Sequence, residues 1–404
     1  MSHTPAYLPL PLHLLFLLAR LELSEEQRQE VLSLCPRITD WREITRLARK
    51  TYVLPLVYQH LSQLAPSSIS ADDMARMHHA SLTILAYNLK TLAEQKRLIQ
   101  DVLAPLAIPY LFFKGPSLAS RYYPEPGLRY CGDIDVLIPR ERLADLLETA
   151  LRLGYRPREP ETLSDQREAL EFAARTLPVI TLMTPGEVEI ELHSQLEKKA
   201  NIYDTDELIR EREALPEGDT TLWVMPTEEL FVYLCLHNTR HCWSNLHWLV
   251  DLDAIQRHPD FNLEAIRACA QARGLSTTLE ASLELYHRLG VQGIDSEDYP
   301  LSPHGRALHE ACIASLLGGN DVEMENRTKR PAPDYAFTWQ TTPTYQMACR
   351  LWQLKMRFMP SYNDYAACPL PPRWQWLYYL TGPWRKLYKR VVLGSLSQSS
   401  SSPE

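Results

Sequence analysis

The sequence predicts an α+β fold in which a small mixed β-sheet is flanked by N-terminal and C-terminal helical layers. Short apolar runs that suit strands are confined to residues 108–193. Apolar residues at helical spacing occupy the chain before this region, over 8–104, and after it, over 227–289. The length of 404 residues exceeds that of a usual single domain and leaves room for a sheet wrapped by helices.

Residues 1–104 predict an N-terminal helical region. Helical spacing runs through 8–64, where Ser24 and Asp40 have the side chains that favour helix N-caps. A longer periodic segment over 71–104 predicts one long helix. We expect this helix to end before Pro105, because proline removes a backbone donor and clashes with the preceding turn.

The segment 105–225 predicts one compact α/β unit. Alternating or short apolar runs predict its strands, and amphipathic spacing predicts its helices. In chain order the expected elements are a strand over 108–113, a turn over 114–117, a short helix over 117–123, a strand over 133–138, a helix over 140–153, and strands over 178–183 and 187–193.

Residues 226–317 predict a helical domain. It opens at Pro226 with the cap sequence Thr227-Glu-Glu-Leu. Its helices are expected over 227–242, 246–257, 263–273 and 277–289. The polar, proline-broken segment 318–340 then predicts a loop or linker.

The C-terminal region is basic and aromatic, unlike the rest of the chain. Residues 345–390 carry eight Lys or Arg residues against Asp364 alone. Such a mixture can stack on RNA or touch an anionic membrane, but amphipathic helices with long basic side chains produce it more often. We therefore expect packed helices over 341–393, with a docked protein partner as the alternative. The Ser-rich tail 394–404 has nothing to bury and should be disordered.

The composition favours a cytoplasmic protein. A formal net charge of −8 disfavours long nucleic acid as a partner. The eight cysteines are scattered without a Cys-x-x-Cys motif, which fits a reducing compartment. The apolar start, residues 8–18, lacks a basic leader and a cleavage site, so it predicts a core helix and not a signal peptide. No other stretch approaches the ~20 apolar residues that a membrane span needs.

Asp133 and Asp135 form the most informative local pattern. Alternate side chains of a strand point to opposite faces, so both carboxylates share one face while Ile134 and Val136 anchor the other in a core. Two like charges so close are costly unless a cation or proton lies between them. The pair therefore predicts a divalent metal site, with solvated carboxylates at the start of a strand as the alternative.

Downstream, residues 187–193 alternate acidic and aliphatic residues. Glu187, Glu189, Glu191 and His193 are expected on one strand face. A neighbouring strand can therefore supply a further carboxylate, although a solvated sheet edge has the same pattern. His193 shares this face and can equally orient a carboxylate by hydrogen bonding, so we do not assign it as a metal ligand.

Upstream, the apolar run that begins at residue 108 ends at Lys114 and Gly115. Pro116 suits the first helical position, and Ser117 follows it, so backbone N–H groups of this turn can hold a phosphate. Lys114 and Arg129 flank the expected pocket. Either cation can neutralise charge on a phosphoryl group, and pairing with nearby acids is an equal alternative.

His237 and His241 are four residues apart on an expected helix and therefore share a face. Together with an acidic residue such a pair can bind zinc, and Asp251 lies in the same stretch and can anchor either ring. Trp243 and Trp248 lie close by, and packing of the helical layer is the simpler role.

The order of these motifs resembles the nucleotidyltransferases of the polymerase-beta-like superfamily. The pattern is Lys-Gly-x-x-Leu, then Arg-x-x-x-Asp-Ile-Asp-x-Leu-Ile, then an acidic residue followed by Leu-His. More narrowly, the chain is similar to the bacterial uncharacterised nucleotidyltransferase family over about residues 10–390. The similarity includes the stretches at 234–241, 248–251 and 358–360.

The resemblance implies metal ligands and a phosphate site. Asp133 and Asp135 would bind two Mg²⁺ or Mn²⁺ ions together with a third carboxylate, Glu191, for which Glu189 is the fallback. A glycine-serine turn holds the triphosphate in that superfamily, and here Gly115-Pro116-Ser117 replaces adjacent glycine and serine. The resemblance also places His237 and His241 at the cleft, in contact with nucleotide or acceptor.

The function implied is transfer of a nucleoside monophosphate from an NTP, with ATP as the first candidate, to a small-molecule or protein acceptor by a two-metal mechanism. A nucleotide-binding or scaffold protein without turnover is the alternative. A zinc hydrolase built on His237 and His241 is a third hypothesis.

Overall fold

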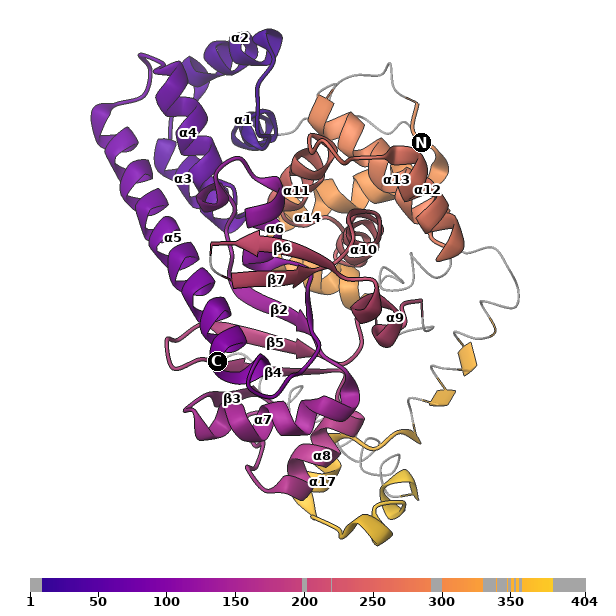
Figure 1. Ribbon diagram of the computed structural model, residues 1–404. Coiled ribbons are helices and arrows are strands. Elements are labelled where there is room, and N and C mark those ends of the chain that lie inside the picture. The colour runs from indigo at the N-terminus through magenta and orange to yellow at the C-terminus, as the bar shows by residue number, and fades with distance from the viewer. Residues whose placement is uncertain are drawn as a thin grey trace, which may run out of the picture. The chain divides into compact units, whose positions relative to one another are not determined.

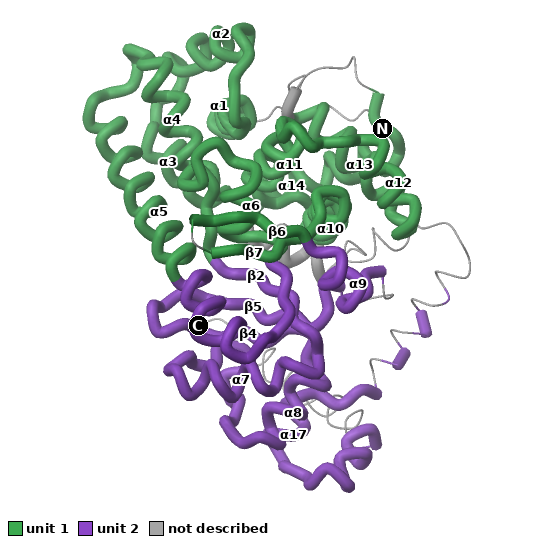
Figure 2. Tube along the Cα trace, in the orientation of Figure 1, with its two compact units in different colours: residues 1–93, 113–132, 213–341 green, residues 94–112, 133–212, 342–404 purple. Residues whose placement is uncertain are grey.

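The computed structural model describes residues 9–197, 202–218, 220–291, 300–329, 339, 347, 350–351, 354–355 and 358–380. The described residues combine helices with a mixed β-sheet (Figure 1), which confirms the predicted α+β class. The chain divides into two compact units (Figure 2). Unit 1 comprises residues 1–93, 113–132 and 213–341, and unit 2 comprises residues 94–112, 133–212 and 342–404.

The first part of unit 1 is helical, as predicted. Its elements are α1 (Leu10–Leu18), α2 (Glu25–Leu34), η1 (Cys35–Arg37), α3 (Trp41–Lys50), α4 (Leu54–Leu64) and most of α5 (Ala71–Leu98). Ser24 and Asp40 are the N-caps of α2 and α3, since their side chains accept hydrogen bonds from the first-turn amides. The long helix α5 continues through the π-turn η2 (Ile99–Leu103) and stops before Pro105.

The later parts of unit 1 contain α6 (Gly115–Tyr122), η3 (Pro126–Leu128) and an antiparallel hairpin of β6 (Glu213–Glu217) and β7 (Thr220–Val224). A helical block follows, which consists of α10 (Thr227–Arg240), α11 (His247–Gln256), α12 (Leu263–Ala272), α13 (Ser276–Tyr286), the π-turn η5 (His287–Val291) and α14 (Pro303–Lys329). The bounds of α10 to α13 confirm the predicted helices of this region to within about three residues at each end.

The linker predicted over 318–340 is wrong for residues 318–329, because α14 continues to Lys329. No proline occurs between residues 304 and 330, and a glycine inside a helix costs only about 1 kcal/mol relative to alanine. The Gly318-Gly319 pair therefore does not break the helix. Most of the remainder of that segment, and the whole tail 394–404, lie outside the described residues.

Unit 2 is built on five strands in the order β3-β4-β5-β2-β1. They are β1 (Leu111–Phe112), β2 (Asp133–Leu137), β3 (Arg156–Glu159), β4 (Val179–Met183) and β5 (Glu189–His193). Strands β2 and β5 are parallel, and the other pairs of this unit are antiparallel, so the sheet is mixed. Strand β1 is shorter than the predicted 108–113, because the preceding residues form turns and loop.

Helices α7 (Leu143–Arg152), α8 (Arg167–Thr176) and α9 (Thr205–Arg210) complete the core of unit 2. Alternation along the paired strands buries one aliphatic face completely, which is formed by Ile134, Val136, Ile190 and Leu192. These side chains hold β2 and β5 in a fixed register. The opposite face of the same two strands carries the acidic residues.

Part of the predicted C-terminal helical region lies within the described residues. It contains α17 (Tyr362–Ala367) and η7 (Pro372–Trp374), whereas the basic cluster beyond residue 380 lies outside. The Tyr362 hydroxyl donates to Thr162 O, and the ring of Tyr365 stacks on Phe172 of α8 at 4.9 Å. This part of the segment therefore packs against α8 within unit 2.

Two negative findings concern the described residues only. No helix among them has both the length and the apolar content for crossing a bilayer. No disulfide joins the described cysteines.

Candidate metal centre

The register between β2 and β5 brings the acidic residues of the two strands side by side. Asp133 pairs with Glu189, and Asp135 pairs with Glu191. Directly paired residues of neighbouring strands point to the same face of a sheet, and so do residues two apart on one strand. Consequently the four carboxylates and His193 belong to one face of the sheet.

Asp135, Glu191 and His193 form the tightest group on this face. His193 Nε2 lies 3.3 Å from Asp135 Oδ1 and 3.1 Å from Glu191 Oε2. The ligand atoms of the three residues all lie within 4.8 Å of one another. Asp135 and His193 are buried, with side chains 4% and 8% exposed, whereas the Glu191 side chain is 33% exposed. The cluster is therefore closed on one side and open on the other.

The pKa of His193 is shifted by the two neighbouring carboxylates. Burial acts to lower its pKa, but hydrogen bonds to Asp135 and Glu191 and their negative charge outweigh burial, so the pKa of His193 is raised. The position between the two carboxylates therefore favours positive charge. A divalent cation with oxygen and nitrogen ligands fits the same field.

The other acidic residues of the predicted strand differ in their surroundings. Glu189 is the register partner of Asp133, and its carboxylate lies 3.9 Å from Arg158. Strand β5 begins at Glu189, and Glu187 adopts a left-handed φ of 57° in the preceding turn. The expectation that Glu187 shares the strand face is therefore wrong, since the turn interrupts the alternation.

The residues predicted to contact phosphate lie in unit 1, at the start of α6. Gly115 has φ of 58°, a conformation that favours glycine, and Pro116 takes an early helical position as predicted. Ser117 is 2% exposed, and its hydroxyl donates to Lys114 O at 2.8 Å. Lys114 Nζ lies 5.5 Å from the ring centroid of Phe113 and 5.4 Å from that of Tyr233. In this arrangement the Ser117 hydroxyl stabilises the turn itself.

Arg129 is bound by a buried carboxylate. Its Nε donates to Asp251 Oδ1 at 2.7 Å and its Nη2 to Asp251 Oδ2 at 3.0 Å. Arg129 is 5% exposed and Asp251 0%. The Tyr123 hydroxyl also donates to Asp251, and Arg129 Nη1 donates to Gly115 O at 3.3 Å. Burial acts to lower the pKa of Arg129, but Asp251 outweighs it and holds that pKa well above its ordinary value. The guanidinium thus ties the Gly115 turn to α11.

His237 and His241 contact each other and Trp248 of the same unit through tilted and edge-on rings. Their ring centroids lie 4.6 Å apart, and each lies 6.0 Å from the Trp248 ring. Among the residues that the structure describes, neither histidine belongs to a group of three or more side chains that could bind one metal ion. A zinc centre on this pair therefore has no third ligand within the described part of the chain.

His247, at the start of α11, provides a pH-dependent prediction. Burial is the main cause that lowers its pKa to about 3, from an ordinary 6.5. Between those two pH values the unfolded chain takes up a proton that the folded protein does not, so stability falls as pH falls. Each such group contributes up to about 1.4 kcal/mol per pH unit.

The variant His247→Gln is expected to lose less unfolding free energy than the wild type between pH 7 and pH 4.5. Urea titrations at several pH values measure this slope. His79→Gln is the matched control, since His79 is exposed on α5, and it should keep the wild-type slope. Equal slopes for all three proteins would contradict the assignment.

Two contacts of the candidate site residues were at most partly indicated by the sequence. His193 contacts both Asp135 and Glu191, whereas the sequence indicated an orienting contact with one carboxylate. The Arg129–Asp251 pair joins residues 122 positions apart, and Asp251 had been considered as an anchor for the histidines. The Leu-His sequence after the alternating acids was a signal for the first contact. The second contact left no local signal.

Comparisons with known proteins place the chain in a family. A family profile described as uncharacterised nucleotidyltransferase matches residues 38–290, more than half of the chain. A search of curated proteins finds no match. The matched span includes the acidic face of β2 and β5, the α6 turn and the histidines of α10. The chain therefore belongs to the uncharacterised nucleotidyltransferase family.

Proposed function

We propose that this protein is a metal-dependent nucleotidyltransferase. It moves a nucleoside monophosphate from an NTP, with ATP as the first candidate, to a nucleophile on a small-molecule or protein acceptor and releases pyrophosphate. The observation that carries the proposal is the Asp135–Glu191–His193 cluster on two paired parallel strands. Membership of a nucleotidyltransferase family supports the transferase class.

The residues of the acidic face fit a divalent cation. Carboxylate oxygens of two neighbouring strands converge with an imidazole nitrogen within 4.8 Å, an arrangement that is costly without positive charge. Asp133, Asp135 and Glu191 would hold Mg²⁺ or Mn²⁺. The metal would neutralise charge on the phosphoryl group and lower the pKa of the acceptor nucleophile. His193 orients the carboxylates of Asp135 and Glu191 by hydrogen bonding.

The cation Lys114 and the backbone amides at the start of α6 are our candidates for contacts with the triphosphate. The first turn of a helix exposes N–H groups that favour anions. We assign Arg129 a positioning role, because Asp251 already occupies its guanidinium and Gly115 O accepts from Nη1. His237 and His241 are candidates for contact with nucleotide or acceptor.

Pyrophosphate release tests the proposal. Purified full-length protein is incubated with each of the four NTPs, with Mg²⁺ or Mn²⁺, and with a panel of hydroxyl compounds and proteins that includes the chain itself. We expect release that depends on the metal and is abolished by EDTA. Long single-stranded RNA, included as an acceptor, should give no release, since the net charge of −8 disfavours its binding.

Calorimetry separates the catalytic function from its alternative. Binding of NTP in the presence of Mg²⁺, without pyrophosphate release from any acceptor of the panel, would favour a nucleotide-binding or scaffold protein. Absence of both binding and release would reject both functions.

A further inference from the structure

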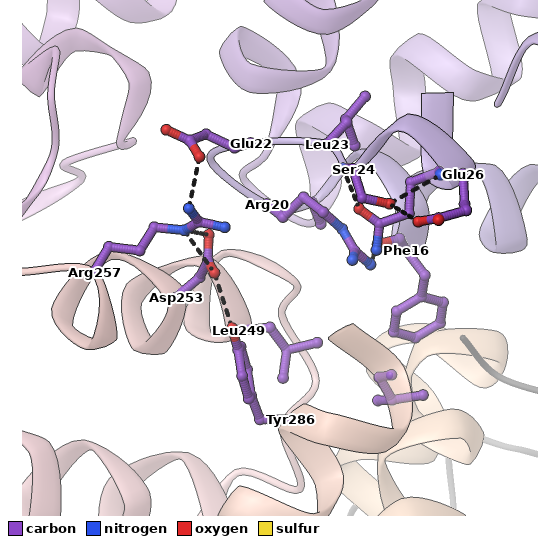
Figure 3. Close-up of a pocket in the computed structure, with 13 residues that line it drawn as sticks. Phe16, Arg20, Glu22, Leu23, Ser24, Glu26, Leu249, Asp253, Arg257 and Tyr286 are labelled. Carbon is purple, nitrogen blue, oxygen red and sulfur yellow. Dashed lines mark hydrogen bonds and ion pairs between the residues drawn. The ribbon is translucent and has the colours of Figure 1, made fainter. Parts of the chain in front are cut away.

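Unit 1 contains a cavity of about 460 Å³ at the end of α1 (Figure 3). This volume lies in the range of cavities that hold small organic ligands. Its apolar wall consists of Phe16, Leu23, Leu249 and Leu289, each less than 9% exposed. The remaining wall carries charged side chains, of which Arg20 is the most deeply buried cation.

Arg20 is a buried guanidinium with few partners. It is 6% exposed, and among the described residues its one side-chain hydrogen bond runs from Nη2 to Phe16 O at 3.2 Å. Nε is buried without a hydrogen-bond partner. No described carboxylate lies within 4.0 Å of this guanidinium. Burial lowers the pKa of Arg20, and the negative charge of Asp253, which makes no ion pair with this guanidinium, offsets burial only in part.

The buried carboxylate of the cavity, Asp253, accepts hydrogen bonds from other donors. Its Oδ1 accepts from the Tyr286 hydroxyl at 2.8 Å, and its Oδ2 accepts from Leu21 N at 2.9 Å. Arg257 Nε lies 3.1 Å from both oxygens. Figure 3 shows Arg257, Asp253 and Tyr286 joined by dashed lines, with the guanidinium of Arg20 outside this group.

The two glutamates of the cavity lie at its solvent side. Arg257 Nη1 donates to Glu22 at 2.8 Å, and the Glu22 side chain is 77% exposed. Glu26 is also exposed and accepts from the Ser24 hydroxyl at 3.0 Å. Water screens both charges. The Arg257 side chain is 42% exposed as well. Arg20 is therefore the buried cation of the cavity, and the one buried carboxylate of its lining, Asp253, is already bound by three other donors.

We propose that this cavity binds a small organic anion, whose carboxylate or phosphate group pairs with Arg20 and whose apolar part packs against Phe16 and the leucines. A planar guanidinium recognises both oxyanions through charge-assisted hydrogen bonds. Such a ligand supplies the directly paired oxyanion that Arg20 lacks among the described residues. The site is independent of the proposed NTP chemistry and needs no metal.

Calorimetry and thermal unfolding in EDTA test the site with two probes, benzoate and phenyl phosphate. EDTA prevents binding that requires Mg²⁺ at the acidic face of β2 and β5. We expect saturable binding and a raised Tm with at least one probe. Preference for benzoate would assign a carboxylate ligand, and preference for phenyl phosphate would assign a phosphorylated one.

The variant Arg20→Met keeps the length of the side chain and removes its charge. We expect it to weaken probe binding at least tenfold, which corresponds to about 1.4 kcal/mol. If Arg20→Met shows no cooperative unfolding, Ala19→Leu replaces it, since it keeps Arg20 and fills the cavity beside it. The control Arg46→Met, which removes an exposed arginine of α3, should bind the probes as the wild type does. Absence of saturable binding of both probes to the wild type, or unchanged affinity in the folded variant, would overturn the proposal.

Discussion

Replacing Asp135 by asparagine is expected to lower metal-dependent pyrophosphate release by more than about 100-fold, since removal of groups that merely support metal ligands already costs 10–100-fold. Asparagine keeps the size of the side chain and removes its charge. Because Asp135 lies within hydrogen-bonding distance of His193 and beside Glu191, this change removes the buried carboxylate of the proposed metal site. The measurement is the rate of pyrophosphate release at saturating NTP and Mg²⁺.

Metal binding provides a readout of the same variant that is independent of turnover. Titration with Mn²⁺ should show weaker binding to Asp135→Asn, while thermal unfolding in EDTA should show a retained fold. The matched control is Glu187→Gln, which removes a carboxylate from the turn before β5, where Glu187 pairs with Arg156. It should keep both activity and metal affinity. Unchanged turnover in purified Asp135→Asn would reject the metal assignment.

Of the substitutions that remove one charged side chain from unit 1, replacement of Asp251 is expected to lower the stability of the protein most. The variant Asp251→Ala leaves the Arg129 guanidinium, 5% exposed, without its bidentate partner. It also removes the acceptor of the Tyr123 hydroxyl. Breaking a buried ion pair from one side costs about 3–5 kcal/mol, because an uncompensated charge stays in the core. The free energy of unfolding in urea measures the effect.

An exposed pair and a double variant test the physical cause. Glu280→Ala breaks the pair with Arg267, whose side chain is 52% exposed, and should change stability by less than about 1 kcal/mol. Combining Asp251→Ala with Arg129→Met removes both charges, and it should recover part of the loss. If the double variant is less stable than Asp251→Ala, buried charge is not the cause.

The helical parts of the chain were predictable because their signals are local. The four helices α10 to α13 follow apolar spacing that lies within each segment. Of these four, α12 has a side-chain N-cap, Asn262, whereas the cap predicted at Thr227 is wrong, because Pro226 is the N-cap of α10. Ser24 and Asp40 cap the helices predicted after them. The strands β2, β4 and β5 were also predicted, since a buried strand needs only five alternating or apolar residues to be recognised.

Several elements were not predicted, among them α8, α9, β6 and β7, and two of the others lack such signals. Strand β3 has the sequence Arg-Pro-Arg-Glu, which is mostly exposed and has no apolar alternation. It is a strand because its backbone pairs with β4 at the edge of the sheet. Helix α14 continues through a glycine pair, although the low helix propensity of glycine predicts that a helix ends there. In both cases contacts with other elements override weak local preferences.

By itself the sequence determined the fold class and the candidate ligands Asp133 and Asp135, because strand alternation fixes which side chains share a face. The order of its motifs indicated the family, and that resemblance named Glu191 as the third carboxylate. Only the tertiary structure decided which of these groups meet. The parallel register of β2 and β5 places Asp135 beside Glu191 and brings His193 to both. Tertiary packing likewise joined Arg129 to Asp251, and it left the Arg20 guanidinium in a cavity where no described carboxylate lies within 4.0 Å of it. Such pairings depend on distances between segments far apart in the chain, which spacing along the sequence does not encode.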